Sequence, residues 1–264
     1  VTDFNGCTTT GSGQVTTPTP LSTQISSQSN ETCFNACNGS ISITTNGGAG
    51  GYQFVWSNPS VPPGTTSSNN LCADNYSITV SDMNGCSEVL QTNIQAALQI
   101  NIALTPTQPT CAGISNGSLQ SGVTGGAPPY QYVWSDGTTL PNANNLDCGI
   151  TYSLTVTDNN ICTVTVSSVL DCPAVMQVDD ITATNALCFG QSSGTASVEV
   201  SGGTPPYSYL WSDANAQTGS TANALPAGIY TVTITDQNGC ANTAQTTVGQ
   251  PTALAVALTD VDVT

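Results

Sequence analysis

The chain has no lysine, arginine or histidine, although it carries 16 aspartate and glutamate residues. Ion pairs between side chains are therefore excluded, and no side chain can neutralise nucleic-acid phosphates or anionic lipid headgroups. Because only 6% of the residues are charged, the acidic groups lie far apart, and screening over about 8 Å at physiological ionic strength keeps their repulsion mild. The composition excludes a nucleic-acid partner and predicts a surface made mostly of neutral hydroxyl and amide groups.

Long apolar runs and helical periodicity are also missing. No run of apolar residues is long enough to cross a bilayer, so we expect no membrane insertion in this segment. Cys-x-x-Cys pairs are absent, and without histidine a zinc site is a poor alternative for the cysteines. Catalysis would depend on carboxylates alone, but these recur along the chain as turn residues, whereas a catalytic pair is normally singular. We therefore expect no enzymatic activity.

An internal repeat organises the residues that are present. Residues 225–240 recur as 71–86 and 146–162, and their closing part recurs as 1–7, with steps of 79, 76 and 78 residues between the final cysteines. We expect the chain to be a segment of a longer array. In the alternative, the two ends of neighbouring copies would complete one repeat by strand donation, but neither end supplies the middle strands of that repeat. The predicted divisions are 1–17 (last strands of a preceding repeat), 18–95, 96–172 and 173–250 (repeats 1, 2 and 3), and 251–264 (first strand of a following repeat).

Each repeat alternates apolar and hydroxyl residues with a period of two. Tyr230, Val232 and Ile234 alternate with threonines in this way, which is typical of a half-buried β-strand. The Asp-x-Asn-Gly that follows is typical of a tight turn. Six or seven short strands with turn residues at this spacing predict a β-sandwich. The fold class is thus all-β, with small sandwich repeats of about 78 residues in a linear array.

Eleven cysteines predict a disulfide framework and an oxidising, extracellular location. In each repeat an opening cysteine precedes the closing one by 51 to 53 residues, which predicts Cys33–Cys86, Cys111–Cys162 and Cys188–Cys240. The remaining cysteines pair most simply as Cys37–Cys72 and Cys148–Cys172. Cys33–Cys72 with Cys37–Cys86 stays open as an alternative, and Cys7 is left without a partner.

Several motifs together resemble one family. They are Gly-Gly-x-Pro-Pro-Tyr-x-Tyr-x-Trp-Ser at 202–212, Leu-Pro-Ala-Gly-x-Tyr-x-Val-Thr-Ile-Thr-Asp-x-Asn-Gly-Cys at 225–240, and the Gln-Pro that follows. The chain resembles the SprB repeats of large secreted surface adhesins of gliding bacteria, over nearly its whole length. The resemblance implies immunoglobulin-like modules in a long cell-surface or extracellular filament, and it brings no catalytic residues.

Three sets of acidic and aromatic residues are candidate sites. The turn acids could bind calcium through hard oxygens, although turn capping explains them more simply; a second group of acids lies near the junctions between repeats. The tyrosines after the Gly-Gly turn could stack on glycans, whereas Trp56, Trp134 and Trp211 are expected in the core. The calcium candidates are Asp82, Asp158, Asp236, Asp171, Asp179 and Asp180, with Asp260 and Asp262, and the glycan candidates are Tyr52, Tyr130 and Tyr207.

The sequence therefore predicts a structural extracellular repeat protein that forms a rod or filament, with neighbouring copies of itself as partners. A surface adhesin module that binds glycans or surfaces is the first alternative, and spacer repeats attached to a distant secreted enzyme are the second. No cofactor is expected other than calcium. The Asn-x-Ser/Thr sequences make the chain a candidate glycoprotein.

Overall fold

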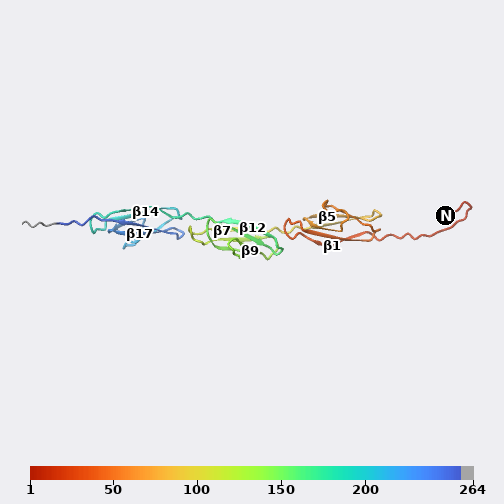
Figure 1. The fold of residues 1–264 in the computed structure, drawn as a ribbon, viewed down its shortest axis with the longest axis horizontal. Coiled ribbons are helices and arrows are strands. Elements are labelled where there is room, and N and C mark those ends of the chain that lie inside the picture. Colours follow the sequence, from red (N-terminus) through yellow and green to blue (C-terminus); the bar gives the residue numbers. More distant parts are fainter. Residues whose placement is uncertain (257–264) are drawn as a thin grey trace, which may run out of the picture. The chain divides into compact units, whose positions relative to one another are not determined.

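The computed structural model describes residues 1–256, and these contain strands and loops but no helix (Figure 1). This confirms the all-β prediction. Repeat 1 contains β1 (Ser22–Ser29), β2 (Gly39–Asn46), β3 (Gln53–Trp56), β4 (Ser67–Leu71), β5 (Asp74–Ser81) and β6 (Ser87–Ile94). Repeat 2 contains β7 (Asn101–Thr107), β8 (Gly117–Thr124), β9 (Gln131–Trp134), β10 (Ala143–Leu146), β11 (Thr151–Thr157) and β12 (Thr163–Val169). Repeat 3 contains β13 (Gln177–Thr184), β14 (Gly194–Ser201), β15 (Ser208–Trp211), β16 (Thr221–Leu225), β17 (Gly228–Thr235) and β18 (Ala241–Val248).

Every repeat has two three-stranded sheets with the same strand order. In repeat 1 the sheets are β1-β2-β4 and β3-β5-β6, in repeat 2 they are β7-β8-β10 and β9-β11-β12, and in repeat 3 they are β13-β14-β16 and β15-β17-β18. All pairings in repeats 1 and 3 are antiparallel. The chain is therefore a tandem array of immunoglobulin-like sandwiches, each built from fewer strands than an antibody domain.

Strand β17 shows how the alternating sequence forms the core. Tyr230, Val232 and Ile234 are buried and the threonines between them are half-exposed. On the partner strand β15, Trp211 lies opposite Val232. Trp211 is 1% exposed, and its indole N–H donates to the carbonyl of Gly219 at 2.9 Å. The equivalent Trp56 and Trp134 are also buried and bonded to loop carbonyls, so the prediction that the three tryptophans belong to the cores is confirmed.

The Gly-Gly turn after the second strand of each repeat lets the incoming chain pass close to it. Gly125 has φ +75°, and a Cβ at this position would lie 1.8 Å from the carbonyl oxygen of Gln99. The corresponding distances are 2.0 Å at Gly47 and 2.1 Å at Gly202. Only glycine combines a positive φ with this approach, so the turn fixes where each first strand begins.

The structure divides into two compact units whose boundary runs through repeat 2. One unit contains Val1–Asn101, Val123–Gln131 and Val156–Val164, and the other contains Ile102–Gly122, Tyr132–Thr155 and the chain from Thr165 onward. The closing hairpin of repeat 2 thus belongs to the same unit as repeat 1, and the opening loop of repeat 2 to the same unit as repeat 3. The repeat boundaries themselves stay a prediction.

Membrane-spanning helices are not found within residues 1–256, where no helix has the length and apolar character that a bilayer crossing requires. The acids Asp260 and Asp262 lie outside the described residues.

Candidate functional site: the cysteine junctions

Each repeat closes with a hairpin whose aspartate is bonded to three backbone amides. In repeat 2, Oδ1 of Asp158 accepts from the amides of Asn160 and Cys162, both at 2.9 Å. Its Oδ2 accepts from the amide of Ala127 at 2.9 Å, directly after the Gly-Gly turn. This carboxylate therefore fixes the shape of the hairpin and fastens it to one end of the sandwich.

The closing hairpins of repeats 1 and 3 have the same geometry. Asp82 accepts from the amides of Asn84, Cys86 and Ala49, and Asp236 accepts from those of Asn238, Cys240 and Thr204, all at 2.9–3.0 Å. These bonds match the turn-capping interpretation of the three aspartates. Because backbone amides already occupy both carboxylate oxygens, a calcium ion would have to compete with three hydrogen bonds at each site.

Hydrogen bonding lowers the pKa of two of these aspartates. For Asp82 the amide of Ala49 makes the largest contribution to the lowered pKa, ahead of an opposing effect of burial. For Asp236 burial acts to raise the pKa, but the amides of Thr204, Cys240 and Asn238 outweigh it and the net shift is downward. Both groups are thus held in the ionised form, which accepts hydrogen bonds most strongly.

Each repeat opens with a loop that presents a cysteine at the other end of the sandwich. In repeat 2, the amide of Thr110 donates to Oδ1 of Asn116 at 2.9 Å, and Nδ2 of Asn116 donates to the hydroxyl of Thr110 at 2.8 Å. In repeat 1 the same two bonds join Thr32 and Asn38. The carbonyl of this threonine, which precedes the opening cysteine, can therefore accept a hydrogen bond from outside the loop.

Disulfides join the opening cysteine of one repeat to the closing cysteine of the next. The bonds are Cys33–Cys162 and Cys111–Cys240, and each spans 129 residues. The predicted pairs Cys33–Cys86, Cys111–Cys162 and Cys188–Cys240 are therefore wrong. Cys86 and Cys188, which were predicted in disulfides, are exposed free thiols, as is Cys7.

The geometry of one sandwich explains this correction. Cys33 lies in the loop between β1 and β2, whereas the hairpin of Cys86 is fastened by Asp82 to Ala49, beyond the far end of β2. Strand β2 has 8 residues, which separates the two ends by about 25 Å at about 3.3 Å per residue. A disulfide needs Cα atoms within about 7 Å, so two cysteines at opposite ends of one sandwich cannot meet.

Strand pairing also explains the Cys37–Cys72 disulfide that forms within repeat 1. Cys37–Cys72 and Cys148–Cys172 join the cysteines as the simpler prediction paired them. In repeat 1, Gly39 pairs with Leu71, so the cysteines that flank this pair leave the sheet at the same end. The alternative of Cys33–Cys72 with Cys37–Cys86 is not found.

A side-chain amide makes a second contact at each junction. Nδ2 of Asn160 donates to the carbonyl of Thr32 at 3.1 Å, next to Cys33. Nδ2 of Asn238 donates to the carbonyl of Thr110 at 3.4 Å, next to Cys111. The asparagine of the Asp-x-Asn-x-Cys hairpin thus holds the opening loop beside the disulfide.

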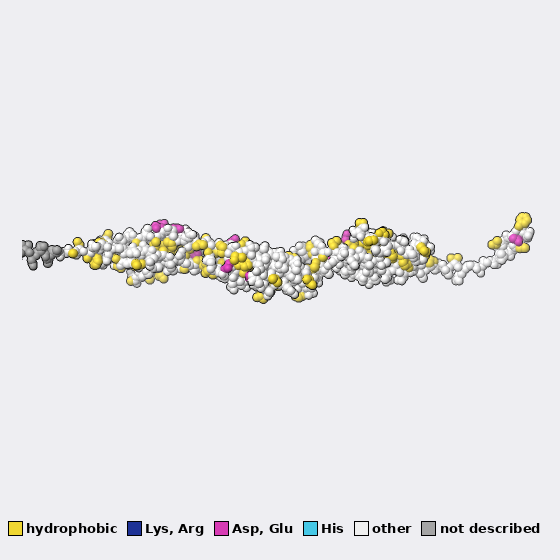
Figure 2. Space-filling view, viewed as in Figure 1, with side chains coloured by type: hydrophobic (Ala, Val, Ile, Leu, Met, Phe, Trp, Pro, Cys, Tyr) yellow, Lys and Arg dark blue, Asp and Glu magenta, His cyan; other side chains and the backbone are white. Residues whose placement is uncertain are grey.

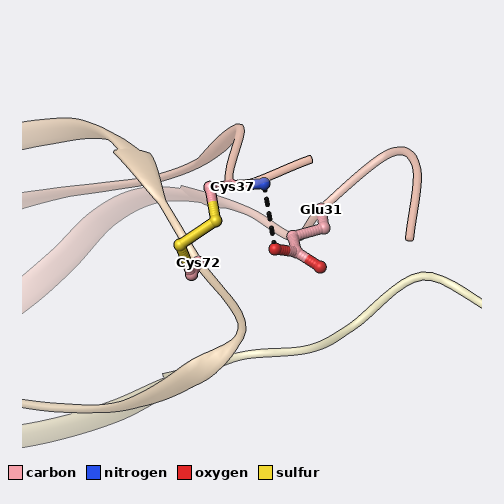
Figure 3. Close-up of side chains that lie close together, drawn as sticks. All are labelled: Glu31, Cys37 and Cys72. Carbon is pink, nitrogen blue, oxygen red and sulfur yellow. Dashed lines mark hydrogen bonds between the residues drawn. A yellow bond between two sulfur atoms is a disulfide. The ribbon is translucent and has the colours of Figure 1, made fainter. Parts of the chain in front are cut away.

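Glu31, Cys37 and Cys72 form the one group of three potential metal ligands within residues 1–256 (Figure 3). Both sulfurs belong to a disulfide and are not thiolates, so they do not offer the ligand form that metals bind. Oε1 of Glu31 instead accepts from the amides of Cys37 and Ala73, at 3.0 and 3.1 Å. The group is therefore a structural cluster at the end of repeat 1.

The acids near the junctions do not gather into a comparable group within the described residues. Asp171, Asp179 and Asp180 are exposed, and Asp179 accepts a bond from the Ser201 hydroxyl at 2.8 Å. Figure 2 shows a small number of acidic side chains on a face made mostly of uncharged groups. Calcium binding by these acids stays a prediction.

The two sets of tyrosines lie in different environments. Tyr52, Tyr130 and Tyr207 are half-buried, and their hydroxyls donate to the first carbonyl of the Gly-Gly turn in their own repeat. Their role as glycan platforms stays a prediction. Tyr76, Tyr152 and Tyr230 are buried, and the hydroxyls of Tyr76 and Tyr230 donate to carbonyls four residues upstream, in the manner of a tyrosine corner. Burial raises the pKa of both.

The pairing between neighbouring repeats was not predicted from the sequence, although one signal was present. Opening and closing cysteines of successive repeats are always 129 residues apart, while the spacing within repeats varies from 51 to 53 residues. A constant spacing is expected where the two residues meet in every copy.

Comparisons with known proteins found one matching family model and several similar solved structures. The SprB repeat family model matches residues 25–61, 103–139 and 181–216. No curated protein matches this chain. One similar solved structure is the N-terminal eight immunoglobulin domains of Down syndrome cell adhesion molecule, with 12% identity over 87% of this chain and 36% of that chain, and a TM-score of 0.42. Another is domains 7, 8 and 9 of the S-layer protein SbsC, with 11% identity over 76% of this chain and 82% of that chain, and a TM-score of 0.24.

The three family matches fall at one position in each repeat, from the first strand to the loop after the aromatic strand. The SprB repeat model thus matches this chain three times, once in each sandwich.

Proposed function

We propose that this chain is a structural element of an extracellular filament, in which successive SprB repeats are locked to each other covalently. The repeats and their disulfides make the chain an extracellular or surface repeat module. The observation that carries the proposal is the disulfide from each opening loop to the closing hairpin of the next repeat. A binding module needs only its own fold to be stable, whereas bonds between repeats fix each repeat to its neighbour.

The overlap of these disulfides supports a load-bearing role. Cys33–Cys162 and Cys111–Cys240 enclose overlapping segments of the chain, so two covalent routes run in parallel between Cys33 and Cys240. Closing a loop of this length stabilises the folded state by about 5 kcal/mol in the chain-entropy model. Tension applied along the array would then be carried by covalent bonds, even where a sandwich opens.

Composition supports the same role. Disulfides persist outside the reducing cytosol, and a surface without lysine and arginine offers no cleavage sites to proteases of trypsin specificity. Many copies can also associate closely without strong electrostatic repulsion between them, since charged residues are sparse. These properties suit a protein that is used in bulk outside the cell.

The test is to locate the chain on cells that produce it. Gold-labelled antibodies against the folded repeats should mark extracellular filaments at regular intervals along their length, because the chain would be the material of the filament. Labelling at filament tips only, or on the cell envelope without filaments, would contradict the proposal. An antibody raised against the unfolded chain serves as the control for nonspecific adsorption.

Glycan binding is the second candidate, and it is favoured by the half-buried tyrosines that recur beside each Gly-Gly turn. A glycan array probed with the intact chain tests it. Binding that is lost in a Tyr52→Ala, Tyr130→Ala and Tyr207→Ala triple variant, but kept in the corresponding phenylalanine variant, would support stacking. No binding on the array would remove this candidate.

A further inference from the structure

Ile161 occupies a backbone position that glycine holds in the other closing hairpins. Its φ is +66°, and Gly6, Gly85 and Gly239 have φ between +81° and +84° at the equivalent position. The turn itself is the same, since the amide of Ile161 donates to the carbonyl of Asp158 at 3.0 Å and Gly239 makes the equivalent bond. A β-branched residue with a positive φ is an outlier, because its side chain crowds the backbone.

Burial does not compensate for this strained backbone within the described residues. The side chain of Ile161 is 82% exposed, so the strain places a large apolar group in solvent. Strained positions of this kind are found mainly where function depends on them. The outlier therefore points to a contact between Ile161 and another molecule.

Ile161 lies beside two other exposed apolar side chains where repeats 1 and 2 are joined. Phe34 follows Cys33 and is 45% exposed, and Leu98 precedes β7 and is 72% exposed. The three side chains line one hollow of about 330 Å³ next to the Cys33–Cys162 disulfide, and all three belong to the same compact unit. Phe34, Leu98 and Ile161 together are called the junction patch below.

The equivalent positions beside the second disulfide show that the fold does not require this patch. Ala112 stands there in place of Phe34, and Gly239 stands in place of Ile161. Both junctions nevertheless have the same disulfide and the same asparagine contact. Phenylalanine and isoleucine are thus additions to a junction that forms without them.

Charge and shape favour a second copy of this chain as the partner. Only uncharged residues line the hollow, and Asp158 of the same hairpin is 5% exposed and bonded to backbone amides. Two chains that each carry a net charge of −16 can therefore meet here without bringing carboxylates together. A cavity of about 150 Å³ already holds benzene, so the hollow has room for an isoleucine side chain.

We infer that the junction patches of two copies meet about a two-fold axis, with Ile161 of each copy inserted into the hollow of the other. The positive φ holds the side chain outward for this contact. This partner rests on the proposed structural role, in which many copies lie close together. Because both copies use the same surface, the contact closes on itself and pairs two chains laterally.

Analytical ultracentrifugation of the full chain with its four disulfides intact tests the pairing. The thiols are first alkylated with iodoacetamide, so that no disulfide can form between copies. The chain should dimerise reversibly as its concentration rises from the micromolar to the millimolar range. Ile161→Ser should weaken the dimer at least about tenfold, because a two-fold contact loses the side chain twice, and Phe34→Ala should weaken it as well. Ile229→Ser is the matched control, since Ile229 is 65% exposed on β17, and it should leave the dimer unchanged.

Ile161→Gly separates the contact from the fold. At micromolar concentration, where the monomer prevails, this variant should melt about 3 °C higher than the native chain, because glycine adopts the positive φ without strain. It should nevertheless weaken the dimer as Ile161→Ser does. A lower melting temperature with unchanged association would show that Ile161 serves only its own sandwich.

Three other results would overturn the inference. They are a chain that stays monomeric up to millimolar concentration, whatever else binds to the junction patch, a dimer that Ile161→Ser leaves unchanged, and a dimer that Ile229→Ser weakens equally. Monomers together with gold labelling along filaments would overturn the pairing alone and leave the proposed function standing.

Discussion

Repeats 1 and 3 have the same sandwich but differ at the end where the opening loop lies. In repeat 1, the Gly39–Leu71 pair is flanked by the Cys37–Cys72 disulfide, and Glu31 is buried beside it. In repeat 3, Gly194 pairs with Leu225 in the same register, but no disulfide follows and Ala186 takes the place of Glu31 at 2% exposure. The fold therefore forms without a disulfide inside the repeat, and the extra one in repeat 1 is an addition to a complete core.

At the end of the sandwich where the opening loop lies, a glycine also packs closely against the last strand in both repeats. A Cβ at Gly39 would lie 2.7 Å from Cγ2 of Ile94, and one at Gly194 would lie 2.4 Å from Cγ1 of Val248. The amide two residues before the opening cysteine donates to the chain after the last strand in each, from Glu31 to Gln95 and from Ala186 to Gly249. Backbone geometry is thus common to the repeats, whereas the cysteines and the buried acid are specific to repeat 1.

The largest effect is expected on the length of the chain under tension. The shortest covalent route passes through Cys37–Cys72 and Cys111–Cys240, which span 35 and 129 residues, so the oxidised chain should extend to less than half the length of the reduced chain. Force spectroscopy with handles at both ends measures this. Cys111→Ser with Cys240→Ser should add about 120 Å, at about 3.5 Å per residue, because the shortest route then runs through Cys33–Cys162 alone. Equal extension before and after reduction would contradict the disulfide pattern.

Removal of the disulfide that is specific to repeat 1 should strongly destabilise that repeat. Cys37→Ser with Cys72→Ser opens a loop of 35 residues, and the chain-entropy model then predicts a loss of about 4 kcal/mol in the free energy of unfolding. Denaturant unfolding followed by the fluorescence of Trp56, in a variant with Trp134 and Trp211 replaced by phenylalanine, measures repeat 1 by itself. The same measurement on Trp211 should show no change in repeat 3.

A glycine substitution probes what the two repeats share. Gly202→Ala forces a non-glycine residue to φ +68° with its Cβ 2.1 Å from the carbonyl of Val175, which should cost about 3 kcal/mol of the free energy of unfolding. Gly47→Ala should destabilise repeat 1 by a similar amount, because the strain acts on a turn common to both. Gly122→Ala has no atom within 4 Å of the new Cβ and serves as control. A neutral Gly202→Ala would refute the role assigned to the turn.

Glu31→Ala makes repeat 1 resemble repeat 3 at one position. The amides of Cys37 and Ala73 lose their acceptor, so we expect a loss of about 2 kcal/mol in the free energy of unfolding, as for hydrogen bonds to a charged group. Glu31→Gln keeps an acceptor oxygen and should lose less. Chemical denaturation of both variants measures the difference, and a stability equal to or above that of the native chain would show that the acid does not stabilise repeat 1.

The smallest effect is the loss of folding stability at acidic pH, and it should be similar in repeats 1 and 3. The pKa values of Asp82 and Asp236 are lowered in the folded state, so their contribution to stability is present above the unfolded pKa of about 3.9 and is lost as the pH falls through the folded pKa. Melting temperatures between pH 6 and pH 2 should therefore fall at the acid end. Asp82→Asn and Asp236→Asn should be less stable at pH 6 and should fall less on acidification, and an unchanged pH profile in both would contradict this account.

Much of the fold could be predicted because its causes are local. The alternation around Val232 and Ile234 sets which side chains face the core, and the Asp-x-Asn-Gly turn sets where the chain reverses, since both depend on a few neighbouring residues. The pairing of Cys37 with Cys72 also follows from elements within one repeat. The position of Trp211 on the strand opposite β17 is a direct result of the same alternation.

The disulfide partners of Cys33 and Cys111 could not be predicted in this way. Repetition places one opening and one closing cysteine in every repeat, but it does not say at which end of the sandwich each lies. The bonds of Asp82 and Asp158 fasten the closing hairpins beside the Gly-Gly turns, a full strand length from the opening loop of the same repeat. The repeats, their strands and their turns follow from the amino-acid sequence alone. Which cysteines meet follows from the fold, because a disulfide depends on distances between the ends of folded sandwiches and not on separation along the chain.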